Sequence, residues 1–98
     1  MQDFTQLKVW QKAHSFTVNL YKISSEFPSE EKFGLTNQIR RAAISIESNI
    51  AEGCGRDSDK EFNRFLSIAK GSCYEVQCQI YIARDLNYIS HQKCDLII

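Results

Sequence analysis

The hydrophobic and polar residues of this chain recur at three- and four-residue steps, which is the pattern of an amphipathic α-helix. A first helix is predicted over about residues 6–27, with Trp10, Leu20 and Phe27 on its apolar side. Pro28 ends it, because proline has no backbone N–H to donate and its ring clashes with the preceding turn. The chain therefore begins with a helix of roughly six turns that presents one side to a core.

A second helix is predicted over about residues 36–52, with Thr36 as its N-terminal cap. Gly53 stands where a left-handed residue would end the helix, and Gly55 adds a second break. Glycines that cradle a phosphate follow a strand and precede a helix, so these two indicate a helix end and not a nucleotide-binding loop. The apolar side of this helix consists of Leu35, Ile39, Ala42, Ile46, Asn49 and Ile50.

The third and longest helix is predicted over about residues 59–86, and Ser58 with Glu61 forms the capping box that opens it. It carries two apolar strips. The first is assigned to the core and consists of Phe62, Leu66, Ala69, Cys73, Val76, Ile80 and Ala83. The second consists of Ile68, Gly71, Cys78 and Ile82, flanked by Tyr74 and Tyr81. Because a small domain has one core, the second strip predicts an interface between subunits.

A fourth helix is predicted to begin at about residue 91 after a cap at Ser90, and its apolar residues include Cys94 and Ile97. It has barely begun where the sequence stops, so we expect a truncated fourth helix. The whole pattern predicts an all-α protein, an antiparallel up-down four-helix bundle in a single domain over residues 1–98. With 98 residues, the chain is long enough for one modest core and too short for two.

The net charge of the chain does not indicate a nucleic-acid-binding protein. Twelve Lys and Arg residues balance twelve Asp and Glu residues, whereas a dedicated nucleic-acid binder usually shows a basic excess. A nucleic-acid site must therefore come from a local group of basic side chains. The candidates are Arg40, Arg41, Arg56 and Arg64. Acidic residues lie between them, so the alternative is a salt-bridged, solvated surface.

No membrane span and no signal peptide are recognisable, so we expect a cytoplasmic protein with reduced cysteines. We predict no cofactor, no metal site and no catalytic residue. Cys73 and Cys78 point about 140° apart on a helix and cannot share a metal ion. Cys73 is assigned to the core and Cys78 to a packing surface. His14 lacks the nucleophile and orienting group of a catalytic constellation and is interpreted as a solvated or edge-packed side chain.

Asn49 lies within the apolar side of the second helix, where an unpaired amide would be costly. We interpret it as a polar residue that fixes helix register through a buried hydrogen bond. The alternative is a binding residue.

Several short motifs follow one another in the order found in a known family. They are Leu7-x-Val9-Trp10-Gln11-x-Ala13, Phe27-Pro28-x-Glu30, Gln38-Ile39-Arg40-Arg41-Ala42, Ser48-Asn49-Ile50-Ala51-Glu52-Gly53 and Phe65-Leu66-x-Ile68-Ala69. Over nearly the whole chain the sequence resembles the four-helix-bundle proteins encoded in intervening sequences of bacterial 23S rRNA genes. The same family includes the accessory protein of diversity-generating retroelements, which assists a reverse transcriptase.

The resemblance implies an antiparallel four-helix bundle that assembles into a ring, typically a pentamer. It also implies association with RNA or a reverse transcriptase through a basic surface. This chain departs from the family in its zero net charge and its short fourth helix. We therefore expect a non-enzymatic homo-oligomeric adaptor for RNA or a reverse transcriptase. The alternative is a structural or protein-interaction module without a nucleic-acid ligand, and an enzyme would need a site built between subunits.

Overall fold

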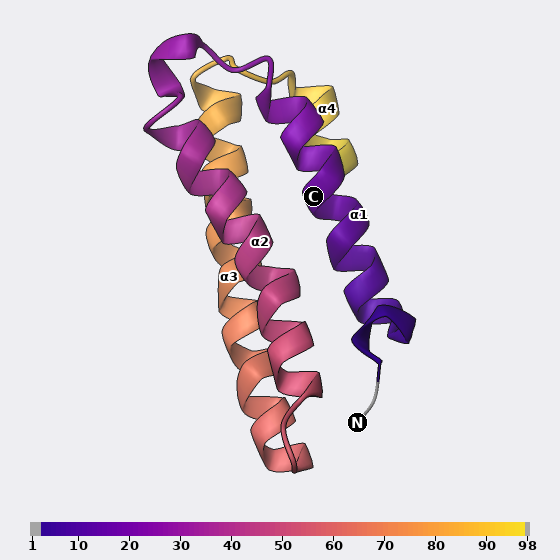
Figure 1. Cartoon of the computed structure of the whole chain (residues 1–98). Coiled ribbons are helices and arrows are strands. Elements are labelled where there is room, and N and C mark those ends of the chain that lie inside the picture. Colours follow the sequence, from indigo (N-terminus) through magenta and orange to yellow (C-terminus); the bar gives the residue numbers. More distant parts are fainter. Residues whose placement is uncertain (1–2, 98) are drawn as a thin grey trace.

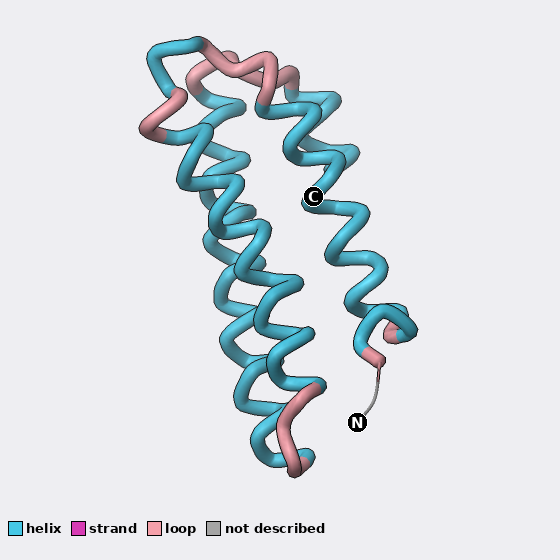
Figure 2. Tube along the Cα trace, viewed as in Figure 1, coloured by secondary structure: helices cyan, strands magenta, loops and turns pink. Residues whose placement is uncertain are grey.

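The structure, a computed structural model, describes residues 3–97, and within that range it consists of helices joined by short turns, with no strand (Figure 1). Figure 2 shows the loops confined to the two ends of the bundle. The helices are α1 (Lys8–Ser24), α2 (Leu35–Cys54), α3 (Asp59–Asp85) and α4 (His91–Ile97), with short 3-10 helices at Phe4–Gln6 and Ser29–Glu31. The predicted all-α class is confirmed.

The four helices alternate in direction, up, down, up and down, and form a rod of 44 × 20 × 19 Å (Figure 1). α2 and α3 lie antiparallel and side by side over their full length. Within the described residues, α1 and α3 each pack against α2, but their backbones do not come close to each other. α2 is therefore the central element, and the short α4 packs against α3 at one end of the bundle.

The core lies between α2 and its two neighbours. Its most deeply buried side chains include Leu20 of α1, Ile39 of α2, Val76 and Ile80 of α3, and Cys94 of α4. These residues recur at helical spacing because each helix turns one apolar side toward the bundle axis. The fold thus follows the amphipathic pattern of the sequence.

The predicted core side of α3 is wrong at one position. Cys73 was assigned to the core but is exposed, whereas Phe65, Ser72 and Gln79 are buried. The side of α3 that faces α2 therefore includes Ser72, whose hydroxyl donates a hydrogen bond to Ser45 Oγ of α2 at 2.9 Å. A polar side chain can be buried at the seam when it is paired in this way.

The predicted cap of α2 is also wrong. α2 begins at Leu35, and Thr36 is buried in its first turn without capping it. Instead, Glu31 Oε1 accepts a hydrogen bond from the Leu35 backbone N–H at 3.0 Å. The other carboxyl oxygen, Oε2, accepts one from the Tyr88 hydroxyl at 2.8 Å. The Glu31 carboxylate therefore caps α2 and also links the start of α2 to the segment that follows α3.

Gly53 does not have the predicted left-handed conformation, since no described glycine has a positive φ and α2 continues to Cys54. The glycine instead allows a close approach of α2 to α3. A Cβ at this position would lie 2.7 Å from Phe65 Cβ and 2.9 Å from Phe62 Cδ1, inside van der Waals contact. The absence of a side chain is what lets the two helices meet at this end.

The caps of α3 combine a predicted and an unpredicted feature. Ser58 Oγ accepts a hydrogen bond from the Glu61 backbone N–H at 3.2 Å, so the predicted serine cap is confirmed. At the other end Asn87 has φ 63°, and the Tyr88 N–H donates to the Ala83 carbonyl at 2.8 Å. This is a Schellman ending, in which asparagine replaces the usual glycine.

The ends of the other two helices are also defined. α1 ends at Ser24, earlier than the predicted residue 27. Ser90 caps α4, because its Oγ accepts a hydrogen bond from the Lys93 N–H at 3.0 Å.

We expect Gly53→Ala to destabilise the protein by about 1–3 kcal/mol, because the added methyl group must displace Phe62 or Phe65. In an ordinary helix interior the same substitution stabilises. Urea denaturation of both proteins measures the difference. Ser48→Ala, at an exposed position of the same helix, is the control and should change the free energy of unfolding by less than about 0.5 kcal/mol.

The Glu31 carboxyl predicts a pH dependence of stability. Its pKa is lowered from the ordinary value of 4.5, first by the Leu35 N–H and then by the Tyr88 hydroxyl. The folded pKa lies below the unfolded one, so this stabilisation is present above the unfolded pKa and is lost as the pH falls through the folded pKa. Between about pH 5 and pH 3, the free energy of unfolding should fall less steeply in Glu31→Gln than in wild-type.

Urea denaturation at each pH provides this measurement, and Glu30→Gln is the matched control because Glu30 is exposed and neighbours Glu31. Wild-type and Glu30→Gln should show parallel curves. Parallel curves for wild-type and Glu31→Gln would contradict the role assigned to this carboxylate.

Candidate interaction surfaces

Arg40 is used within the fold. Its Nε donates to Ser24 Oγ at 2.8 Å, its Nη2 donates to the Tyr21 carbonyl at 3.0 Å, and its guanidinium lies 4.4 Å from the centre of the Tyr21 ring. Its positive charge also lies beside the C-terminal end of α1, where it complements the partial negative charge of that helix end. Arg40 therefore joins α2 to α1. Arg41, the next residue, is exposed and makes no ion pair within the described part of the chain.

Arg56 and Arg64 lie together at the opposite end of α2. Their guanidinium groups lie 4.8 Å and 5.0 Å from the centre of the Phe65 ring. Each is paired with a carboxylate of its own segment, Arg56 with Glu52 at 3.0 Å and Arg64 with Glu61 at 3.2 Å. Positive charge at this end is thus balanced locally.

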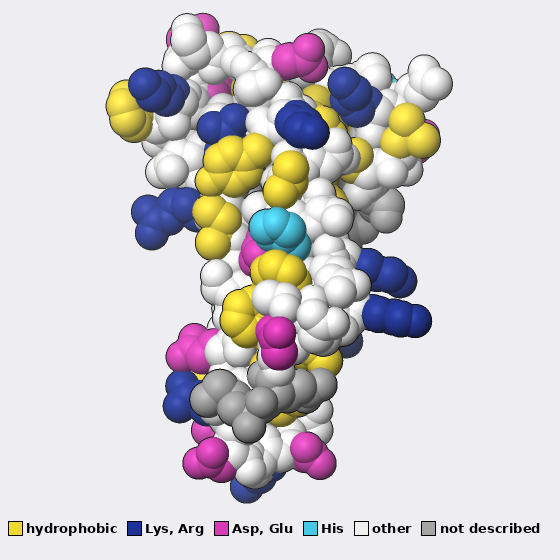
Figure 3. All heavy atoms as spheres, turned by 45° about the vertical axis from the view of Figure 1, so that its right-hand side comes forward, with side chains coloured by type: hydrophobic (Ala, Val, Ile, Leu, Met, Phe, Trp, Pro, Cys, Tyr) yellow, Lys and Arg dark blue, Asp and Glu magenta, His cyan; other side chains and the backbone are white. Residues whose placement is uncertain are grey.

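The four predicted arginines therefore form two separate pairs. α2 rises about 1.5 Å per residue, so the backbones of Arg40 and Arg56 lie about 20 Å or more apart. On the face shown in Figure 3, Lys and Arg side chains are scattered among hydrophobic and acidic ones and form no continuous basic patch. One copy of the chain does not bring the four guanidinium groups to one ligand.

The second apolar strip of α3 is exposed on the outside of the bundle. We call Ile68, Gly71, Cys78 and Ile82 the outer strip. The exposed fractions of the isoleucines are 43% and 44%, and the neighbouring Tyr74 and Tyr81 are exposed as well. A Cβ added at Gly71 would meet nothing within 4 Å. Residues 3–97 therefore leave this strip uncovered, in the position that the sequence predicts for an interface.

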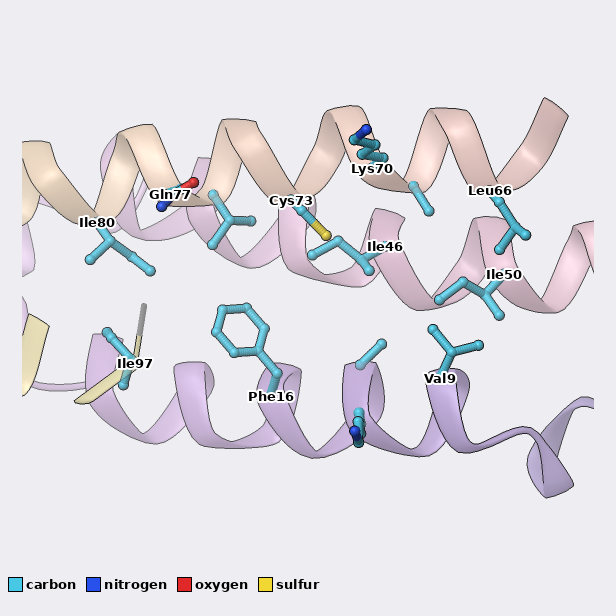
Figure 4. Close-up of a pocket in the computed structure, with 14 residues that line it drawn as sticks. Val9, Phe16, Ile46, Ile50, Leu66, Lys70, Cys73, Gln77, Ile80 and Ile97 are labelled. Atoms are coloured by element: carbon cyan, nitrogen blue, oxygen red, sulfur yellow. The ribbon is translucent and has the colours of Figure 1, made fainter. Parts of the chain in front are cut away.

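An apolar groove runs along the other side of α3, between α1 and α3 (Figure 4). Ile46 and Ile50 of α2 form its floor, and its volume is about 500 Å³. α1 contributes Val9, Lys12, Ala13 and Phe16 to the walls, and α3 contributes Leu66, Ala69, Lys70, Cys73, Val76, Gln77 and Ile80. Ile97 of α4 stands at one end. The groove was not predicted from the sequence, although Val9, Ala13 and Phe16 follow the helical spacing that places them on one side of α1.

Cys73 lies in the wall of this groove. Partial burial raises the pKa of its thiol. A raised pKa lowers the fraction of thiolate, the form that reacts and binds metals. Cys73 thus contributes an apolar contact to the groove.

His14 is held by a carboxylate and an aromatic ring. Its Nδ1 lies 3.0 Å from Glu47 Oε2 of α2, and its ring stacks on Trp10 with 4.8 Å between centres. Trp10 in turn meets Phe4 edge to face at 5.2 Å. The His14–Glu47 contact joins the N-terminal half of α1 to α2, and the aromatic contacts support it from within the N-terminal part of the chain. In residues 3–97 no three His, Cys, Asp or Glu side chains are placed to hold a metal ion.

Asn49 belongs to the α2–α3 seam. Its Nδ2 donates to the Ser45 carbonyl at 2.8 Å and to Ser45 Oγ at 3.0 Å. The same Ser45 Oγ accepts the hydroxyl hydrogen of Ser72 from α3. Both bonds of Asn49 stay within α2, and the bond that crosses to α3 is made by the two serines, so the register role of Asn49 stays a prediction.

Comparison with protein families decides what kind of chain this is. A family model described as "23S rRNA-intervening sequence protein" matches residues 5–98. The chain belongs to that family. Among curated proteins, none matches the chain.

The matched region of this 23S rRNA-intervening sequence protein includes all four α-helices, the two arginine pairs, the outer strip and the groove. The resemblance recognised in the sequence is thereby confirmed. Within the described residues, no helix of this intervening-sequence protein is both long and apolar enough to cross a bilayer.

Proposed function

We propose that this 23S rRNA-intervening sequence protein is a non-enzymatic, cytoplasmic adaptor whose subunits associate through the outer strip of α3. The exposure of that strip is the observation that supports the proposal. Ile68 and Ile82 are separated by about four turns of helix, so the apolar surface extends along much of α3. An apolar strip on a small monomer is a typical protein-contact surface.

Gly71 strengthens the case for association. A glycine in the interior of a helix costs about 1 kcal/mol relative to alanine. At Gly53 this cost is offset by close packing inside the subunit, but Gly71 has no intramolecular neighbour. A role for Gly71 between subunits explains its presence, because the missing side chain lets a second helix approach closely.

The proposed assembly is a closed ring of identical subunits, a pentamer by resemblance to the family. In such a ring the outer strip of one subunit packs against a different surface of the next. The proposed partners are RNA or a reverse transcriptase, held by a scaffold that repeats each surface around the ring. Repetition raises the effective concentration of weak sites.

Gly71→Trp should convert the assembly to monomers, because the indole fills the space that a neighbouring helix needs. Each subunit should keep its fold, since nothing lies within 4 Å of this position. Light scattering at micromolar concentration gives the mass, and circular dichroism gives the helical content. Gly71→Ala is the matched control and should remain assembled. A wild-type protein that is monomeric under these conditions contradicts self-association.

RNA binding is the second candidate function, and the pairing of Arg56 with Arg64 over one Phe65 ring favours it. The two guanidinium groups, with the exposed Arg41, offer phosphate contacts without any base-reading motif. Each subunit carries no net charge, so one copy should bind weakly and the assembly more tightly.

We expect RNA binding to weaken steeply with salt and to be lost in an Arg41→Ala/Arg56→Ala/Arg64→Ala variant. Gly71→Trp should also lose binding, although its arginines remain. A Lys8→Ala/Lys22→Ala/Lys32→Ala variant removes the same charge elsewhere and is the control. Fluorescence anisotropy with labelled RNA measures the affinities. If wild-type does not bind RNA at low salt, or if the arginine variant binds RNA as tightly as wild-type, RNA binding through these arginines is contradicted. The proposed function is then protein interaction alone.

A further inference from the structure

We propose that the turn before α2 packs on the outer strip of a second copy of this chain. In this contact the Phe33 ring lies over Gly71 of the neighbouring copy. The adjacent Lys32 ammonium pairs with the Glu75 carboxylate of that copy. The inference rests on the proposed self-association and adds to it the surface that meets the outer strip.

Phe33 is the most exposed large apolar side chain in residues 3–97. Its exposed fraction is 86%, compared with 79% for Leu96 and 62% for Tyr74. Single exposed apolar side chains are common on protein surfaces, so the geometry around the ring has to decide whether it is an anchor. Aromatic side chains that leave water on association are typical of interface centres.

The turn that carries Phe33 is held in place on both sides. The Gly34 N–H donates a hydrogen bond to the Glu31 carbonyl at 2.9 Å. The Glu31 side chain caps α2 and accepts the Tyr88 hydroxyl, so the turn is fixed to α2 and to the segment after α3. A group on a fixed backbone loses less conformational entropy when it binds. The backbone of Phe33 is therefore pre-organised for a contact.

A cation accompanies the ring. Lys32 Nζ lies 5.6 Å from the centre of the Phe33 ring. Lys32 is exposed and forms no ion pair within the described residues. The two carboxyl oxygens of Glu31 are already hydrogen bonded, and Glu30 stands three positions before the ring. The turn thus presents an apolar ring with an available ammonium group beside it.

The outer strip has a depression of matching chemistry at Gly71. A Cβ added at this glycine would meet nothing within 4 Å. Ile68 and Tyr74 stand three positions before and after it, so they flank it on the surface of the helix. Both are exposed, and together they form apolar walls for a ring that lies on the bare backbone. An aromatic pair with Tyr74 adds to such a contact.

Glu75 supplies the complementary charge. It stands four positions after Gly71 and three before Cys78, on the same side of α3 as the outer strip. Its carboxylate is exposed and forms no ion pair or hydrogen bond within the described residues. When the strip is covered, this carboxylate needs a cation beside it, because an unpaired charge is costly to bury.

The two surfaces match in spacing. In the turn, 5.6 Å separate the ammonium group from the ring centre. On the strip, Gly71 and Glu75 are about 6 Å apart along the helix axis. A ring over the glycine therefore brings the Lys32 ammonium within reach of the carboxylate.

The contact joins different copies of the chain. The turn lies at the end of the bundle where α3 ends at Asp85 (Figure 1). Gly71 lies about 21 Å before that end along α3, so Phe33 does not reach the Gly71 of its own copy. Because the turn and the strip are different surfaces, the contact is heterologous, the kind that generates a closed ring.

Neither surface borders the groove between α1 and α3. At 100° per residue, Gly71 and Glu75 lie on the opposite side of α3 from Cys73 and Gln77, which line the groove. The 3-10 helix of the turn packs against α2, whereas α4 packs against α3. A helix placed in the groove would therefore leave both surfaces uncovered.

The anchor is tested by removing the ring. Light scattering over a dilution series of the 98-residue chain gives the concentration at which the assembly dissociates. Phe33→Ser should raise this concentration at least about thirtyfold, as expected for an interface anchor. Leu96→Ser removes another highly exposed apolar side chain and should leave it unchanged. Circular dichroism should show equal helical content in all three proteins, because both side chains are exposed.

A charge-reversal cycle tests the pairing. Lys32→Glu and Glu75→Lys should each raise the dissociation concentration about tenfold, because each places like charges together. The Lys32→Glu/Glu75→Lys variant should return to within about threefold of wild-type. Lys60→Glu makes the same charge change at the other end of the bundle and is the control. Lys32→Ala should have an effect of less than about fivefold, because it creates no repulsion.

The results separate this inference from the proposed function. A monomeric wild-type contradicts self-association and this contact with it. An assembled wild-type whose mass Phe33→Ser leaves unchanged keeps the proposed function and overturns only this contact. Dissociation of Phe33→Ser without recovery in the double charge variant also overturns it, because the ring then binds elsewhere on the neighbouring copy.

Discussion

The close packing of α2 against α3 is the contact on which the rest of this structure depends. At one end Gly53 removes the side chain that would otherwise meet Phe65, and in the middle a serine from each helix shares a hydrogen bond. At the other end Glu31 caps α2 and accepts the Tyr88 hydroxyl from the segment after α3. Because these contacts are spread along the pair, they fix its register as well as its distance.

The position of α1 follows from that pair. α1 packs on the remaining side of α2 through the Arg40 bonds to Ser24 and Tyr21, and through the His14–Glu47 pair. The Thr17 hydroxyl also donates to the Ala43 carbonyl at 3.3 Å. Every one of these contacts is to α2, so α1 and α3 stay apart and the groove lies between them.

The contacts of the arginines differ in kind from those of the apolar residues of α3. Arg40 is bonded to α1, and Arg56 and Arg64 are paired with glutamates, so all three guanidinium groups make contacts within the chain. The apolar residues of α3, in contrast, are not all buried within the described part of the chain. They face outward on one side and into an open groove on the other.

The sequence by itself determined the number, order and approximate ends of the helices, because amphipathic spacing and caps such as Ser58 are local properties. It also located the outer strip, which is a periodicity within one helix. Only the tertiary structure decided that Cys73 lines a groove, that Glu31 and not Thr36 caps α2, and that Gly53 serves packing. Likewise, it alone separated the four arginines into two pairs. Each of these features depends on which side of a helix meets which neighbour, and on side chains up to 57 residues apart, as for Glu31 and Tyr88. Spacing along one helix carries no information about such distances.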